Sequence, residues 1–241
     1  HEAAMRRGAR VIAPERPGMG LSSYQPHRRM MDWPGDVAQL ADALGMRRVA
    51  VMGVSGGGPY VAACALAIPD RLTAAGIVSG VGPMDRPGGT DGMLRMNKIL
   101  FGVQRRFPPA GRAVVWLQSL VMKRIGIRGF ERFAKTLPPA DQAIASRPEV
   151  RDLFIADLRE AFRHGARGAA LENRLYASDW GFRLQDIRMP VHLWQGEDDR
   201  NVPVAHGRYQ AEAIPDCRAR FYPGEGHGNR KAASRLDYAL R

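Results

Sequence analysis

The chain has 241 residues, 45% hydrophobic and 25% charged, a balance that indicates one large or two small globular domains. Its net charge of +12 is carried mostly by Arg residues dispersed among Asp and Glu, without a basic block, zinc-finger spacing or aromatic RNA-binding motif. No apolar run approaches the ~18–20 residues of a membrane span. We therefore predict no nucleic-acid partner and no membrane span.

The first third of the chain alternates predicted strands and helices. Apolar runs predict strands at residues 10–14, 47–53 and 72–79, the first of them short and buried. Helical patterns lie at 32–45 and 56–68, the former with Asp32 as its cap, Pro34 in its first turn and Gly45 as its stop. This alternation predicts a parallel sheet covered by helices on both faces, an α/β fold.

A long helical insert interrupts this rhythm. Residues 84–180 contain no convincing strand but several helical patterns, separated at Pro108-Pro109 and Pro138-Pro139. The strand and helix rhythm then resumes, with strands predicted at 189–194 and 217–222 and helices at 203–214 and 228–240.

The sequence Gly53-Val54-Ser55-Gly56-Gly57 lies between a predicted strand and a predicted helix. Gly-x-Ser-x-Gly in that setting is typical of a nucleophile elbow, a sharp turn that holds the serine in a strained backbone conformation with its hydroxyl exposed. We expect Gly53 and Gly57 to occupy positions where a side chain would collide. The helix N-terminus behind Ser55 favours negative charge.

Two further motifs follow the last two predicted strands. Asp198 and Asp199 come after the strand at 189–194, and His227 comes after the strand at 217–222. The carboxyl ends of parallel strands share one edge of a sheet, so these residues should converge with Ser55. A serine hydroxyl needs a base, and the base needs a carboxylate that orients it. Ser55, His227 and one of the two aspartates can fill these roles.

With these motifs in order, the chain resembles the α/β-hydrolase superfamily of esterases, lipases and C–C hydrolases. Residues 14–22 are similar to the family's Asp-Arg-Pro-Gly-x-Gly-x-Ser loop, with Glu15 in place of Asp. The resemblance implies a mostly parallel, doubly wound sheet formed by residues 1–83 and 181–241, with 84–180 as a helical cap over the site. It also favours Asp199 over Asp198 as the acid.

The resemblance further implies an acyl-enzyme mechanism without cofactor or metal. Ser55 attacks, His227 accepts its proton, Asp199 orients the ring, and the Gly56 backbone N–H stabilises the oxyanion. The second oxyanion donor, and a strand between those at 10–14 and 47–53, would lie upstream of His1. Because a gap in the sheet would leave several backbone groups unpaired, at roughly 1–3 kcal/mol each, we expect this chain to be an N-terminally incomplete hydrolase that folds poorly alone or rearranges its sheet.

The leading hypothesis is thus a serine hydrolase acting on an ester, amide or related acyl bond of a small molecule. The Met-rich insert hints at an apolar acyl or alcohol group, while the exact substrate and the oligomeric state are left open. Alternatives are C–C hydrolysis or cofactor-free perhydrolysis by the same triad, and a ligand-binding or inactive pseudo-hydrolase. We expect a cytoplasmic protein, although a signal peptide upstream of His1 would not be visible.

Other reactive side chains receive structural roles. Cys64 and Cys217 are too few for a disulfide framework and are expected to be buried small hydrophobes. The remaining internal histidines are expected to be structural or on the surface: His27, His164, His192 and His206.

Overall fold

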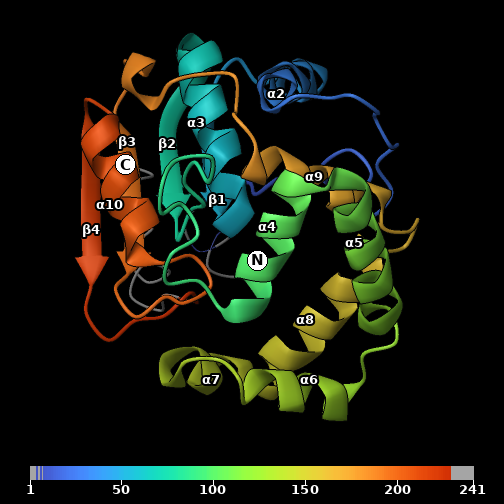
Figure 1. Ribbon diagram of the computed structural model, residues 1–241. Coiled ribbons are helices and arrows are strands. Elements are labelled where there is room, and N and C mark those ends of the chain that lie inside the picture. The colour runs from blue at the N-terminus through green and yellow to red at the C-terminus, as the bar shows by residue number, and fades with distance from the viewer. Residues whose placement is uncertain (1–3, 5, 7, 229–241) are drawn as a thin grey trace.

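The computed structural model describes residues 4, 6 and 8–228 (Figure 1). Its strands are β1 (Val49–Val54), β2 (Leu72–Val78), β3 (Val191–Gly196) and β4 (Cys217–Tyr222). Outside the insert the helices are α2 (Trp33–Ala43), α3 (Gly58–Ala67) and α10 (Val204–Ala213). The insert contains α4 (Arg95–Arg106), α5 (Pro108–Met122), α6 (Ile127–Ala134), α7 (Pro139–Ala145), α8 (Pro148–Ala161) and α9 (Arg167–Ala177).

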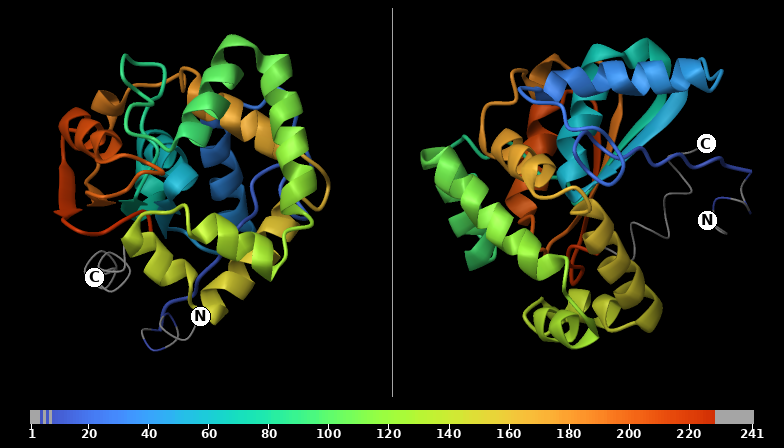
Figure 2. Two further views of the ribbon diagram at one scale, coloured as in Figure 1. Left: turned by 60° about the horizontal axis from the view of Figure 1, so that its bottom comes forward. Right: turned by 90° about the vertical axis from the view of Figure 1, so that its right-hand side faces the viewer.

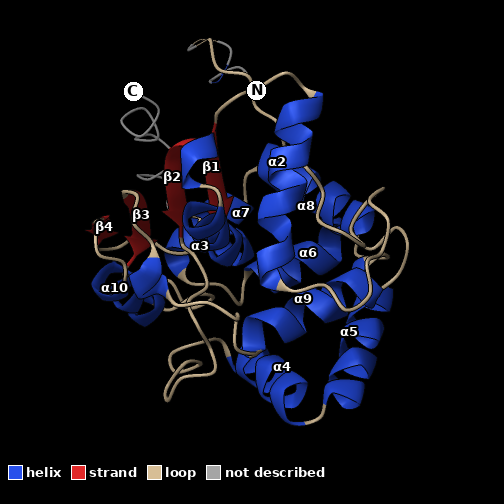
Figure 3. Cartoon of the chain, turned by 90° about the horizontal axis from the view of Figure 1, so that it is seen from above, coloured by secondary structure: helices blue, strands red, loops and turns tan. Residues whose placement is uncertain are grey.

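The four described strands form one parallel sheet in the order β1-β2-β3-β4, which confirms the predicted α/β class. Helix α3 packs on β1 and β2 and helix α10 packs on β3 and β4, both on the same face of the sheet (Figure 3). The main apolar core lies under these helices and includes Ala62, Ile77 and Leu193. The helix predicted at 228–240 lies outside the described residues, apart from Gly228.

Strand β1 forms one edge of the described sheet. Its burial alternates, because Val51 and Gly53 face the packed side while Met52 and Val54 are half exposed. The strand predicted to lie beside β1 from an upstream segment stays a prediction.

Two expectations for the N-terminal region are wrong. Residues 10–14 form no strand, and Val11 is 71% exposed, because none of the strands in the described part of the chain pairs with this backbone. Asp32 does not cap α2 with its side chain. Its carboxylate instead accepts the backbone N–H of Arg29 at 2.7 Å and closes the short 3₁₀ turn before the helix. The expected stop is confirmed, since α2 ends at Ala43 and Gly45 adopts a φ of +68°.

The insert lies at the carboxyl end of the sheet, with α6, α7 and α8 farthest from α2 and α3 (Figures 1 and 2). It has an apolar cluster of its own, centred on Ile125, Phe130 and Ile155. Helix α9 packs against α4 and α5. No strand occurs between β2 and β3, as the helical spacing predicted. No helix among the described residues has the length and apolar content needed to cross a membrane.

Both cysteines lie in apolar surroundings. Burial raises the pKa of the Cys64 thiol to about 12 and that of the Cys217 thiol to about 11. Neither is a thiolate near neutral pH, which fits the expected packing role.

His206 is a fully buried, neutral histidine of α10. Burial, with a smaller contribution from the Arg86 charge, lowers its pKa from 6.5 to about 4. Its Nδ1 accepts the backbone N–H of Gly82 at 2.9 Å, which fixes the loop after β2 to α10. The ring is therefore a structural acceptor, as expected for this position.

This burial predicts acid sensitivity. Between about pH 6.5 and pH 4 the unfolded chain binds a proton at this ring and the folded chain does not, so stability falls as pH falls. The pKa difference corresponds to roughly 3 kcal/mol. We expect His206→Asn, which keeps an acceptor but does not titrate, to lose less stability than wild type in urea unfolding over this range. The exposed control His164→Asn should follow wild type, and parallel pH profiles of wild type and His206→Asn would contradict the prediction.

Candidate active site

Ser55 directly follows β1 and has a φ of +55°, a left-handed conformation that is rare for a residue with a side chain. Such strain is common where a functional side chain must be held in one place. A Cβ on Gly53 would lie 2.3 Å from the Gly57 carbonyl oxygen, so a side chain is excluded there. The expectation for Gly57 is wrong, because a Cβ there would meet open space. Crowding by backbone is found instead at Gly58, whose Cβ would lie 2.8 Å from the backbone of the loop after β2.

Asp199 lies in the loop after β3 and is buried. Its Oδ1 accepts the backbone N–H groups of Asn201 and Val202, each at 2.8 Å. Its Oδ2 lies 2.8 Å from His227 Nδ1 and also accepts a hydrogen bond from Gln195 Nε2 at 3.1 Å. These four contacts hold both carboxylate oxygens and aim one of them at the histidine ring.

Asp198 does not share this environment. Its side chain is exposed, and its backbone N–H donates to the Glu225 carbonyl at 3.0 Å. The loops that carry Asp199 and His227 therefore touch through their backbones. This contact requires Gly196, because a Cβ there would lie 2.4 Å from the carbonyl oxygens of Glu225 and Gly226.

His227 follows β4 and is held at its backbone as well as its ring. The Ser79 hydroxyl donates to its carbonyl oxygen at 3.1 Å, and its N–H donates to Asp141 of α7 at 3.0 Å. Ser79 is buried directly after β2, with a φ of +47°. The loops after all four strands thus meet at the carboxyl edge of the sheet.

The fold brings Ser55, Asp199 and His227 to this one edge, and it joins only the last two by a hydrogen bond. Within the described part of the chain, Ser55 and His227 are not hydrogen-bonded to each other. Such contacts are often long without substrate and shorten when it binds. The ring can therefore serve as a base oriented by a carboxylate, with the serine at the same edge.

Gly56, the expected oxyanion donor, lies against helix α9. A Cβ on Gly56 would lie 2.5 Å from the Tyr176 hydroxyl, so the packing of α9 leaves no room for a side chain here. The Gly56 carbonyl accepts a weak hydrogen bond from Arg16 at 3.4 Å. The loop that resembles the family motif therefore reaches the elbow.

A buried charged network connects that loop to α9. Glu172 lies 3.0 Å from Arg16 and forms a second ion pair with Arg28. The hydroxyls of Tyr60 and Tyr176 donate to the same carboxylate at 2.7 and 2.6 Å. Burial lowers the pKa of Arg28 and raises that of Tyr176 to about 12, so both tyrosines are neutral donors. One carboxylate thus balances two guanidinium groups beside the elbow.

Glu15 has a local structural role. Its carboxylate accepts the backbone N–H of Leu21 at 2.7 Å, and its carbonyl accepts the Ser22 hydroxyl at 2.7 Å. A Cβ on Gly20 would overlap the Glu15 carboxylate, so the loop closes around this side chain. Glutamate can therefore close this turn, at the position where the similar family loop has aspartate.

Sequence reasoning missed Gln195, Ser79, Asp141 and Glu172. Gln195 contacts Asp199 four residues away. The other three contact a candidate site residue or its neighbour across a long sequence separation. Only Ser79 carried a signal, as the last residue of a predicted strand. Among the described residues no cluster of three or more His, Cys, Asp or Glu side chains is arranged to hold a metal ion.

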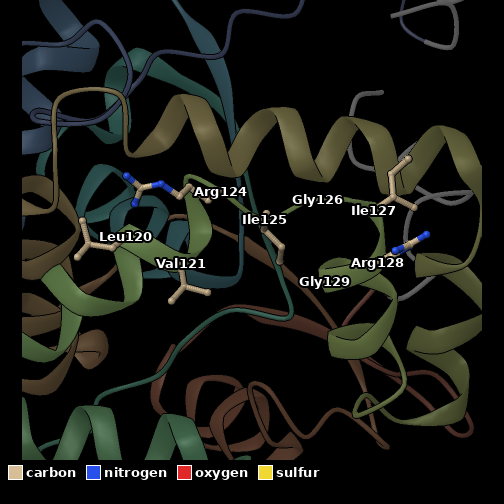
Figure 4. Close-up of a pocket in the computed structure, with 8 residues that line it drawn as sticks. All are labelled: Leu120, Val121, Arg124, Ile125, Gly126, Ile127, Arg128 and Gly129. Atoms are coloured by element: carbon tan, nitrogen blue, oxygen red, sulfur yellow. The ribbon is translucent and has the colours of Figure 1, made fainter.

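An open pocket of about 820 Å³ lies in the insert, where α5 ends and α6 begins (Figure 4). Its lining is mostly aliphatic, with two arginines: Leu120, Val121, Arg124, Ile125, Gly126, Ile127, Arg128 and Gly129. Ser55, Asp199 and His227 do not line it.

Comparison with known proteins agrees with this fold. The family model for the alpha/beta hydrolase fold matches residues 2–229. A non-heme haloperoxidase of Rhodococcus erythropolis is 26% identical over 232 residues, covering 93% of this chain and 77% of that protein. A non-heme chloroperoxidase of Streptomyces lividans is 30% identical over 226 residues, covering 92% and 76% respectively.

Among solved structures, an esterase from Exiguobacterium antarcticum superposes with a TM-score of 0.70 at 16% identity, covering 100% of this chain and 85% of that one. This likeness shows the fold. The relatives are enzymes, and they support an enzyme here. By its matched residues and its fold, the chain belongs to the α/β hydrolase family.

Proposed function

We propose that this protein is a serine hydrolase that cleaves an ester, amide or related acyl bond of a small molecule with an apolar acyl or alcohol group. The observation that carries the proposal is the contact of His227 with the buried Asp199, at the sheet edge where Ser55 stands in a strained turn. Helices α4–α9 act as a cap over this edge, and no cofactor takes part.

The chemistry follows from these positions. Ser55 Oγ attacks the acyl carbonyl carbon while His227 Nε2 accepts the hydroxyl proton, and the Gly56 N–H stabilises the oxyanion. The tetrahedral intermediate collapses to an acyl-enzyme, and His227 returns the proton to the leaving alcohol or amine. Water then loses a proton to His227 and attacks the ester, releasing the acid and restoring Ser55. Asp199 keeps Nδ1 protonated throughout and stabilises the imidazolium.

A second candidate is favoured by the two haloperoxidase relatives. Hydrogen peroxide, in place of water, would attack the same acyl-enzyme and release a peracid, with the proton passing through His227. The two candidates share Ser55 and differ only in the acyl acceptor. Peracid formed from an acetate ester with hydrogen peroxide, measured against hydrolysis of that ester, distinguishes them.

The proposal is tested by labelling the purified chain with a fluorophosphonate and mapping the adduct by mass spectrometry. We expect one adduct at Ser55, absent in Ser55→Ala and weakened in His227→Ala, because the probe requires an activated serine. Replacement of an exposed serine of the insert, Ser146→Ala, should leave labelling unchanged. A folded wild-type chain without label at Ser55 would contradict the proposal and favour a ligand-binding protein on this fold.

A further inference from the structure

The loop that carries His227 is anchored from three directions. Asp199 holds the ring and Ser79 holds the carbonyl oxygen, and both come from loops of the sheet. The third anchor is Asp141, in the first turn of α7, which belongs to the insert. Its Oδ2 accepts the His227 N–H at 3.0 Å and its Oδ1 accepts the Gly228 N–H at 2.8 Å.

This third anchor is a specific contact. A carboxylate has two acceptor oxygens and no donor, so it matches two consecutive backbone N–H groups, and its charge strengthens both hydrogen bonds. Asp141 is only 7% exposed. Burial of a carboxylate is unfavourable unless such donors satisfy it, and these two N–H groups do so.

The close contact between α7 and this loop also explains the two glycines beside the histidine. A Cβ on Gly226 would lie 2.5 Å from the Asp141 carboxylate, and a Cβ on Gly228 would lie 2.5 Å from the Ile144 side chain. The Gly-His-Gly sequence therefore lets α7 reach the backbone of the histidine loop. The insert and the site are joined at the residue proposed as the base.

We propose that Asp141 is a positioning residue that couples the placement of the insert to the placement of the His227 ring. The proposal rests on the proposed function in that His227 is taken as the base. Asp141 acts through the backbone of His227, so its loss displaces the ring relative to Ser55 without removing a group of the triad. Displacements of about 1 Å at a reacting group can lower rates about 100-fold.

The experiment compares wild type, Asp141→Ala, Asp141→Asn and the exposed insert control Asp157→Asn. Two readouts are used: kcat and KM for a p-nitrophenyl ester, and the NMR signals of the His227 and Gly228 amide protons. In Asp141→Ala we expect both amide protons to move upfield, and kcat to fall roughly 10- to 100-fold with KM unchanged. Asp141→Asn keeps one acceptor, so it should hold one amide and lose less activity, and Asp157→Asn should match wild type.

The proposal is overturned if both Asp141 variants are folded and retain wild-type kcat, or if the two amide signals do not respond. It is also overturned if KM alone changes, since that would indicate a substrate contact. If Asp141→Ala does not fold, Asp141→Asn decides by the same criteria. The amide signals need no turnover, so a wild-type chain without fluorophosphonate label would reject the proposed function while the NMR result still decides whether Asp141 positions the loop.

Discussion

Asp199→Asn is expected to lower kcat by about four orders of magnitude while the fold is retained. The asparagine oxygen can replace Oδ1 and keep the N–H groups of Asn201 and Val202. Its amide nitrogen then takes the place of Oδ2 and faces His227 Nδ1 as a donor. The ring must present Nδ1 as an acceptor and carry its proton on Nε2, where it can no longer accept the proton of Ser55.

The neighbouring aspartate provides the matched control for this variant. Asp198→Asn changes the same charge one residue away on an exposed side chain and should retain wild-type kcat. Activity is measured on a p-nitrophenyl ester, and urea unfolding shows that both variants are folded. Equal losses in the two variants, or no loss in Asp199→Asn, would contradict the role assigned to Asp199.

Glu172→Gln is expected to lower the free energy of unfolding by roughly 3–5 kcal/mol, the usual cost of removing one partner of a buried ion pair. Glu172 and the Arg28 side chain are almost fully buried, at 3% and 1% exposed, and Arg16 lies on the other carboxylate oxygen. Without the negative charge the two guanidinium groups would repel each other, and Arg28 is almost fully shielded from water. Domain stabilities are only about 5–15 kcal/mol, so the variant should be markedly destabilised.

Urea unfolding measures this loss, and a second substitution tests its cause. Removing one cation as well, in the double variant Arg28→Met and Glu172→Gln, should restore part of the lost stability because the repulsion is relieved. Glu160→Gln, which breaks an exposed ion pair with Arg163, should unfold like wild type. A Glu172→Gln variant as stable as wild type would show that the network contributes nothing through its charge.

The elements that the sequence predicted well are those defined by local patterns. The strands after residue 46, helices α3 and α10 and the all-helical insert follow from apolar periodicity and from Gly and Pro at their ends. The elbow followed in the same way, since its glycines and strand are adjacent in the chain. The predicted strand at 10–14 failed because an apolar run becomes a strand only where another strand accepts its hydrogen bonds.

Errors at single residues have the same origin. Asp32 is of a residue type that often caps helices. Its carboxylate accepts a hydrogen bond from the Arg29 backbone N–H instead of from the first turn of α2. Gly57 has the motif spacing of a crowded glycine, but the helix turns so that Gly58 meets the loop after β2. Motif spacing indicates that a side chain is excluded near the elbow, and only the packing decides at which residue.

By itself, the sequence determined the parallel α/β arrangement and the order in which Ser55, Asp199 and His227 follow their strands. Each strand and each motif is recognised from a few adjacent residues. The resemblance favoured Asp199 over Asp198. The contact between Asp199 and His227 depends on how the loops after β3 and β4 pack together. Only the tertiary structure decided that Asp141 reaches the His227 loop and that Glu172 holds two arginines, because these partners lie far apart in the chain and meet only when the insert packs onto the sheet.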